Sequence, residues 1–365
     1  MQNPSTFHFD STEFQHLLKQ LAAKTGELNS IQNSAVEQLR LLADANVLGW
    51  GIPKEYGGSE LLNCEMTSGY EKLASACLLT TFVLTQQNGA CQRIAGSENS
   101  ELKEMLLPSI TRGEIFATVG ISHLTTSRQH FSKPAVGVSI DGDQMVFNGM
   151  VPWVTGANHA QFIVTGGTCH DNRQVLAAIP THLPGVEVQP PIEMLSMSAS
   201  QTSAIKLSNV TIDAKYLIAG PVDNVMQQGL GGGTGSLATS ALAIGSAAAS
   251  LQGIQKEAGA RPDLLPIYEP LKMEYDDLQN DMYSVADCGR KGKNSNFTSE
   301  VIRRRANSLV LRTSQAYLAA SKGAGFVTGH PAERAVREAM FFLVWSCPQP
   351  VLQAALEEFA CTIDR

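Results

Sequence analysis

The sequence predicts an α+β fold with an N-terminal helical domain, a small antiparallel β-barrel or sandwich in the middle, and a C-terminal four-helix bundle. Three observations predict it. Apolar residues recur at helical spacing over residues 1–113, short β-rich runs bounded by turn residues fill residues 114–220, and long helical patterns return over residues 221–365. These three ranges are the predicted domains.

The first predicted helix carries apolar residues at positions i, i+3, i+4 and i+7, namely Phe14, Leu17, Leu18 and Leu21. Ser11 or Thr12 is expected to cap its N-terminus. The spacing predicts further helices around Val36–Leu42, over residues 70–94 and over residues 102–110.

The middle of the chain contains six short β-rich runs without helical patterns between them. They cover residues 115–122, 135–140, 145–155, 161–166, 175–180 and 203–212. An Asp-Gly-Asp turn at residues 141–143 separates two of them. Strands that follow one another in this way favour an antiparallel barrel or sandwich.

The C-terminal part returns to long helical patterns with short links, which is typical of an up-and-down bundle. The helices are predicted over residues 236–258, 266–287, 299–322, 331–344 and 351–359. The glycine-rich segment 228–235 has no buried strand before it and lacks the P-loop lysine, so it is interpreted as the entry to a helix capped by Thr234 or Ser236.

Composition excludes several classes of protein. The chain has 365 residues, of which 43% are hydrophobic and 17% charged, so it is not disordered in bulk. Its net charge of −7 provides no general attraction for nucleic acid or anionic membranes, and the basic run 303–305 is expected on a solvated helix face or at a subunit contact. The apolar stretch 240–251 is shorter than a membrane span, and the N-terminus has no apolar signal core.

Seven scattered cysteines without a CxxC motif favour reduced thiols and a cytoplasmic location. The eight histidines contain no close metal-ligand pair, so no metal site is expected.

Four motifs, in this order along the chain, resemble segments of the acyl-CoA dehydrogenase family of flavoproteins. They are LGWGIPKEYGG at 48–58, a Gly-Glu pair at 113–114 followed by the strand that ends Gly-Ile-Ser at 120–122, NGMVPWVTG at 148–156, and GAGF at 323–326 with Glu333 and Arg337 downstream. The resemblance covers nearly the whole chain. It implies an FAD between the β-domain and the helical bundle, partly held by a neighbouring subunit of a homodimer or homotetramer.

The resemblance also assigns the residues around the flavin ring. Trp153 is expected to pack against the isoalloxazine, as a strand aromatic can. Thr155, two residues further along the strand and so on the same side, is expected to donate to flavin N5. Ser122 stands where the family has a Thr and is expected near flavin N1 or O2, where hydrogen bonds tune a flavin.

Two phosphate contacts follow from the same resemblance. Ser127 or Arg128 falls near the family's Gly-Ser that touches the pyrophosphate. Arg261 stands at the family's arginine that reaches the FAD phosphates of the partner subunit, a role that suits a guanidinium.

The expected catalytic base is missing. Removal of an α-proton from an acyl thioester needs a carboxylate in a desolvated pocket. The family's Glu corresponds to Ser346, and its second location corresponds to Gly235 or Ser236. His123, next to the flavin-facing strand, is the candidate substitute acid or base.

Three hypotheses follow. The first is an FAD-dependent oxidoreductase that lacks the usual Glu and acts as a monooxygenase, an oxidase or a divergent dehydrogenase on a small molecule such as an acyl thioester. The second is a non-catalytic relative with a structural or binding role. The third is an acyl-CoA dehydrogenase with a relocated base such as His123.

Overall fold

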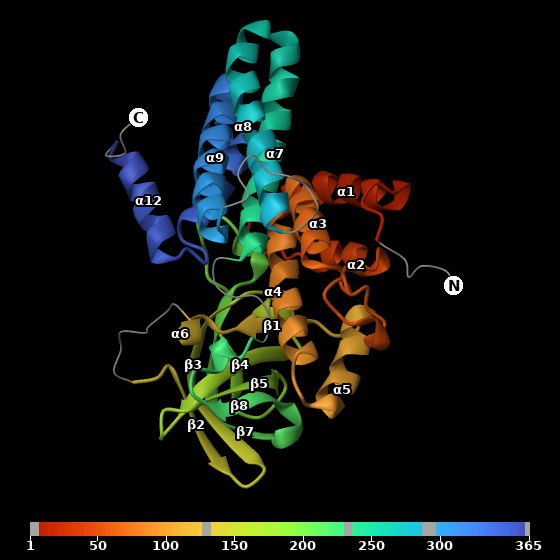
Figure 1. The fold of residues 1–365 in the computed structure, drawn as a ribbon, viewed down its shortest axis with the longest axis vertical. Helices are drawn as coiled ribbons and strands as arrows, with labels where there is room; N and C mark the ends of the chain where they lie inside the picture. The colour runs from red at the N-terminus through yellow and green to blue at the C-terminus, as the bar shows by residue number, and fades with distance from the viewer. Residues whose placement is uncertain (1–6, 126–132, 230–235, 287–296, 362–365) are drawn as a thin grey trace.

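The structure is a computed structural model that describes residues 7–125, 133–229, 236–286 and 297–361. Figure 1 shows a β-sheet at one end of the molecule, long helices extending from the other end, and the N-terminal helices along one side. The predicted order of helices, strands and helices is confirmed, because all eight described strands lie between Ala117 and Val222. The division into separate domains stays a prediction.

Five helices precede the sheet: α1 (Thr12–Lys24), α2 (Val36–Asp44), α3 (Asn63–Ala76), α4 (Leu78–Ala95) and α5 (Ser100–Thr111). Ser11 caps α1 as predicted, because its hydroxyl accepts a hydrogen bond from the Phe14 amide at 3.2 Å. The single helix predicted over residues 70–94 is wrong. Cys77 has extended backbone angles (φ −154°, ψ 102°) and divides that range between α3 and α4.

Eight strands form one sheet: β1 (Ala117–Gly120), β2 (Val136–Asp141), β3 (Gln144–Val154), β4 (Phe162–Cys169), β5 (Gln174–Pro180), β6 (Val186–Val188), β7 (Ser203–Asp213) and β8 (Leu217–Val222). Their order is β6-β7-β3-β2-β4-β5-β8, and β1 pairs with β4 outside this path. Two of these strands, β6 and β8, were not predicted.

Most strand pairs are antiparallel, as expected, but two are not. Strand β4 pairs in parallel with β1 and, over two residues, with β2. The predicted antiparallel sheet is therefore confirmed in its main part, and the parallel pairings of β4 are an addition that the sequence did not predict. The short helix α6 (Ser122–Thr125) follows β1 directly, so the predicted strand 115–122 ends two residues early.

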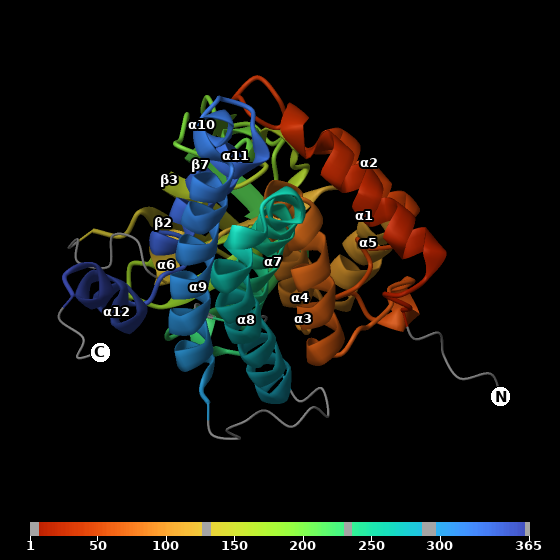
Figure 2. The same cartoon turned by 90° about the horizontal axis from the view of Figure 1, so that it is seen from above.

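The C-terminal helices are α7 (Leu237–Ala260), α8 (Leu265–Val285), α9 (Ser299–Ala320), α10 (Lys322–Gly325), α11 (Pro331–Met340) and α12 (Gln349–Phe359). Seen from above, α7, α8 and α9 lie side by side (Figure 2). Helix α7 is long and apolar enough to cross a membrane by length and composition, yet 72% of its most apolar window is buried, as in the core helix of a folded domain.

The prediction for the basic run on α9 is also corrected. Arg303 is fully buried instead of solvated, and one guanidinium nitrogen donates to the Trp345 carbonyl at 3.1 Å. Arg305 forms an ion pair with the buried Asp281 at 2.6 Å. This part of the run therefore stabilises the bundle from within the chain.

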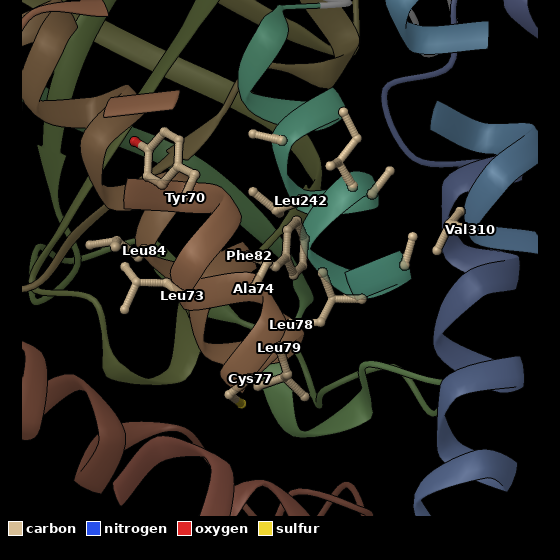
Figure 3. Close-up of a cluster of buried hydrophobic side chains, with 14 of the residues drawn as sticks. Tyr70, Leu73, Ala74, Cys77, Leu78, Leu79, Phe82, Leu84, Leu242 and Val310 are labelled. Atoms are coloured by element: carbon tan, nitrogen blue, oxygen red, sulfur yellow. The ribbon is translucent and has the colours of Figure 1, made fainter. Parts of the chain in front are cut away.

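Helices from both ends of the sequence share one core. Side chains of α3 and α4, such as Leu73 and Phe82, gather with Leu242 of α7 (Figure 3). The buried carboxylate of Glu71 on α3 accepts hydrogen bonds from Tyr275 at 2.6 Å and from Tyr283, both on α8. The N-terminal helices and the bundle thus form one continuous support for the cleft described next.

Candidate functional site

A cleft of about 1660 Å³ opens where the sheet meets the helices. Its walls come from α3, α4, the end of β1 with α6, the end of β3, the loop 192–196, the start of α7 and the segment 340–346. Segments far apart in the sequence therefore meet at one place. Four of the seven predicted site residues line this cleft, and they are Ser122, Trp153, Thr155 and Ser346.

Trp153 projects into the cleft from an irregular part of β3. The β3–β7 pairing shifts register between Val151 and Val154, and Trp153 has a left-handed backbone (φ 57°). Its side chain remains 53% exposed, which is unusual for a tryptophan so close to the core. The bulge thus presents a large flat ring whose surface is available to a ligand.

Thr155 lies deeper in the same wall and is only 4% exposed. Its hydroxyl shares a hydrogen bond of 3.1 Å with the Thr202 hydroxyl, and its carbonyl accepts one of 2.7 Å from Thr118. Trp153 and Thr155 both line the cleft, and their contacts with a flavin stay predictions. Regular strand alternation does not place them on the same side, because the bulge interrupts the strand between them.

Ser122 begins α6 and lines the cleft, where its hydroxyl donates to the Pro152 carbonyl at 3.2 Å. The next residue, His123, is directed elsewhere. Its Nε2 lies 2.9 Å from the Gly166 carbonyl on β4, and its side chain is not among the described residues that line the cleft. The structure therefore ties His123 to the sheet, which does not favour its predicted role as a base in the cleft.

Ser346 lines the same cleft from a left-handed turn (φ 44°) after α11. An aromatic cluster adjoins it, in which the rings of Phe341 and Trp345 stack at 5.0 Å and Phe82 meets both edge-on at 4.8 Å. Behind the turn, Arg303 holds the Trp345 carbonyl, and desolvation lowers the pKa of its guanidinium to about 10. The turn is therefore anchored from α9.

No buried carboxylate lines the cleft within the described residues. The two glutamates that do line it, Glu60 and Glu193, are exposed. A general base for carbon acids needs a raised pKa, and exposure to water does not provide one. The loss of the expected Glu at position 346 is therefore not compensated by another buried acid in the described walls.

One of the two predicted phosphate contacts, Arg261, stands apart from this cleft. Arg261 follows α7, whose opposite end lines the cleft, so a helix of about 36 Å separates the two. Its guanidinium bonds to Glu257 at 3.2 Å and to the Ala320 carbonyl in its own chain. A contact with a partner's FAD stays a prediction. Ser127 lies outside the described residues.

The sequence reasoning missed the polar face of α4. Thr85, Gln86, Gln92 and Arg93 line the cleft from this helix. Arg93 is buried, its Nη1 donates to the Gly89 carbonyl at 2.8 Å, and desolvation lowers its pKa to about 10. The signal was present in the sequence as four polar residues within the helix predicted over residues 70–94.

Comparisons with known proteins agree with this architecture. The family described as "Acyl-CoA dehydrogenase, N-terminal domain" matches residues 13–114. The probable acyl-CoA dehydrogenase YngJ of Bacillus subtilis is 23% identical over 341 residues, which are 88% of each chain.

Two solved structures share the fold at low identity. A glutaryl-CoA dehydrogenase from Mycobacterium smegmatis in complex with FADH2 superposes with a TM-score of 0.78 at 16% identity, covering 96% of this chain and 95% of the other. The prolyl acyl carrier protein oxidase AnaB gives 0.76 at 17% identity, covering 97% of this chain and 100% of the other. Residues 13–114 therefore match the N-terminal domain of the acyl-CoA dehydrogenase family, and the chain as a whole has the fold of these proteins and is similar along most of its length to a probable acyl-CoA dehydrogenase.

Proposed function

We propose that this protein is an FAD-dependent oxidoreductase that works without the carboxylate base expected at position 346. The observation that carries the proposal is that Trp153, Thr155 and Ser122 line one cleft together with Ser346. The first three stand where the family resemblance implies contacts with a flavin. The fourth replaces the group that would remove a proton from carbon.

The described residues fit a flavin. The cleft exceeds the usual 300–1,000 Å³ of a small-molecule pocket, so a dinucleotide and a substrate have room together. Trp153 offers a half-exposed indole face for a flat ring system. The hydroxyls of Ser122 and Thr155 supply polar groups on the same wall. A bound flavin supplies hydride-transfer and oxygen chemistry.

The chain's own residues would orient the reactants. Trp153 would pack against the flat ring of a flavin, and the hydroxyls of Thr155 and Ser122 would be available to hydrogen-bond it. Phe341, Trp345 and Phe82 supply an apolar, water-excluding wall beside Ser346, suited to the acyl part of a thioester. Ser346 can donate or accept a hydrogen bond but is too weak a base to remove a carbon-bound proton by itself.

This set of groups favours an oxidase, a monooxygenase or a divergent dehydrogenase over ordinary thioester desaturation. Orientation and exclusion of water are what the described walls provide. A cytoplasmic location and assembly into a homodimer or homotetramer belong to the same proposal. Light scattering on the purified protein measures the assembly.

A second candidate is a non-catalytic relative, favoured by the absence of a buried acid from the described cleft walls. The two candidates differ in one measurable property. The enzyme binds FAD stoichiometrically in a form that substrates or reductants reduce, and the non-catalytic relative does not.

The test is a titration of the purified protein with FAD, followed by its visible spectrum and fluorescence. Wild-type protein is expected to bind FAD, and Trp153→Ala is expected to weaken binding roughly tenfold because the indole face is lost. Phe359→Ala is the matched control, since Phe359 is 56% exposed but does not line the cleft. A wild-type protein that stays colourless with FAD present contradicts the proposal.

A further inference from the structure

Three buried hydroxyls form a chain that ends at the cleft. Ser200 Oγ lies 2.8 Å from Thr202 Oγ1, which in turn lies 3.1 Å from Thr155 Oγ1. All three residues are at most 4% exposed. Thr155 and Thr202 line the cleft, whereas Ser200 lies behind them.

The backbone holds this chain in place. Val154 of β3 pairs with Ser203 of β7, and the Gly156 amide donates to the Ser200 carbonyl at 2.9 Å. On the other side, the Thr118 hydroxyl donates a hydrogen bond to the Thr155 carbonyl and holds that backbone in place. The three hydroxyls therefore keep their separations while each O–H bond stays free to rotate.

The chain has no fixed direction. A hydroxyl donates one hydrogen bond and accepts up to two, so either member of each pair can be the donor. If Ser200 donates to Thr202 and Thr202 to Thr155, then the Thr155 hydrogen points to a ligand acceptor. If all three hydroxyls rotate, Thr155 accepts a hydrogen bond from a ligand donor and donates its own hydrogen bond to Thr202.

This reversal matches the chemistry of one flavin atom. N5 of an oxidised flavin has no hydrogen and accepts a hydrogen bond, whereas N5 of a reduced flavin carries a hydrogen and donates one. A lone threonine that accepts from N5–H leaves its own hydrogen buried without an acceptor, which is costly. Thr202 removes that cost by accepting a hydrogen bond from the Thr155 hydroxyl.

We infer that Thr202, supported by Ser200, is a positioning residue that lets the Thr155 hydroxyl serve as donor to the oxidised flavin and as acceptor from the reduced flavin. The inference rests on the proposed function, in which Thr155 faces N5. It assigns to Thr202 a redox-dependent role that acts through Thr155.

The test is the midpoint potential of the FAD-loaded protein, measured by slow chemical reduction beside a dye of known potential. Thr202→Val keeps the shape of the side chain but removes the acceptor. The ratio of reduced to oxidised flavin at a fixed potential is expected to fall about tenfold, because the reduced state loses the partner of the Thr155 hydrogen. The potential therefore shifts downward.

Thr202→Ser keeps the hydroxyl and is expected to restore the wild-type potential. Thr313→Val is the matched control, since it removes a buried threonine hydroxyl that bonds to the Leu309 carbonyl within α9 and does not line the cleft. Its potential is expected to match the wild type. Thermal unfolding of each variant reports any common loss of stability.

The outcomes separate the two proposals. If wild-type protein binds FAD and Thr202→Val leaves the potential unchanged, the role of Thr202 is overturned while the flavoprotein stands. Weaker binding of both redox states by the same factor overturns the inference too, because it means uniform contact with the ligand. A wild-type protein that binds no FAD overturns both proposals.

Discussion

Ser346 is the residue that most sharply separates this chain from the family pattern that it resembles. It lines the cleft from a turn that Arg303 anchors through the Trp345 carbonyl. A carboxylate at this position would lie beside the aromatic cluster, where partial desolvation raises its pKa toward that of a general base.

Ser346→Glu is therefore expected to give FAD-loaded protein whose visible absorbance bleaches on anaerobic mixing with acyl-CoAs that leave the wild type unchanged. Ser346→Gln is the control, because it has the same size but cannot take a proton from carbon. Bleaching by both variants would assign the effect to pocket shape. No bleaching by Ser346→Glu with acyl chains of any length would contradict the view that only the base is missing.

At the same scale, the sequence predicted the identity of cleft residues better than their geometry. Trp153, Thr155, Ser122 and Ser346 all line the cleft. The bulge that positions Trp153 depends on how β3 pairs with β7, a strand distant in the sequence. The spacing of residues within β3 does not predict that pairing. The direction of His123 likewise depends on a carbonyl of β4, 43 residues away.

At the scale of elements, α7 is the central helix of the helical part, because its small residues let the neighbouring helices approach closely. A Cβ added at Gly245 would lie 2.2 Å from the Glu71 carbonyl oxygen of α3. That atom belongs to a backbone and has little room to yield. The contact between the N-terminal helices and the bundle therefore depends on the absence of a side chain at position 245.

Gly245→Ala is expected to lower the free energy of unfolding by about 1–3 kcal/mol, because overpacking outweighs the better helix propensity of alanine. Gly259→Ala is the matched control in the same helix. No atom lies within 4 Å of its added Cβ, so a gain of up to about 1 kcal/mol is expected. Denaturant unfolding of both variants measures the difference, and equal effects would refute the role of close packing.

Element boundaries were predictable where local signals decide them and not where tertiary contacts do. The Ser11 cap of α1 has a local signature, and the prediction there is confirmed. The break at Cys77 has no such local signature, because the apolar pattern continues on both sides of it. Strand β6 has only three residues, and its single pairing with β7 is what defines it.

At the scale of the whole molecule, α11 joins the bundle to the N-terminal helices around Glu338. This carboxyl lines a small cavity of about 260 Å³, together with Cys77 of the α3–α4 junction, Lys256 of α7, Tyr317 of α9 and Arg334 of α11. Desolvation raises the pKa of Glu338 from 4.5 to about 7, although Arg334 and Arg337 oppose the shift. Burial thus outweighs two neighbouring cations.

The raised pKa makes the folded state hold a proton that the unfolded chain releases. The contribution of Glu338 to stability is therefore complete below pH 4.5 and is lost as the pH rises toward about 7, where the folded form also ionises. The loss amounts to at most about 3 kcal/mol. Glu338→Gln carries no titrating group, so its free energy of unfolding is expected to fall less than that of the wild type between about pH 5 and pH 7. Denaturant unfolding at several pH values measures both slopes; parallel curves would mean that Glu338 ionises in the folded protein as it does in the unfolded chain.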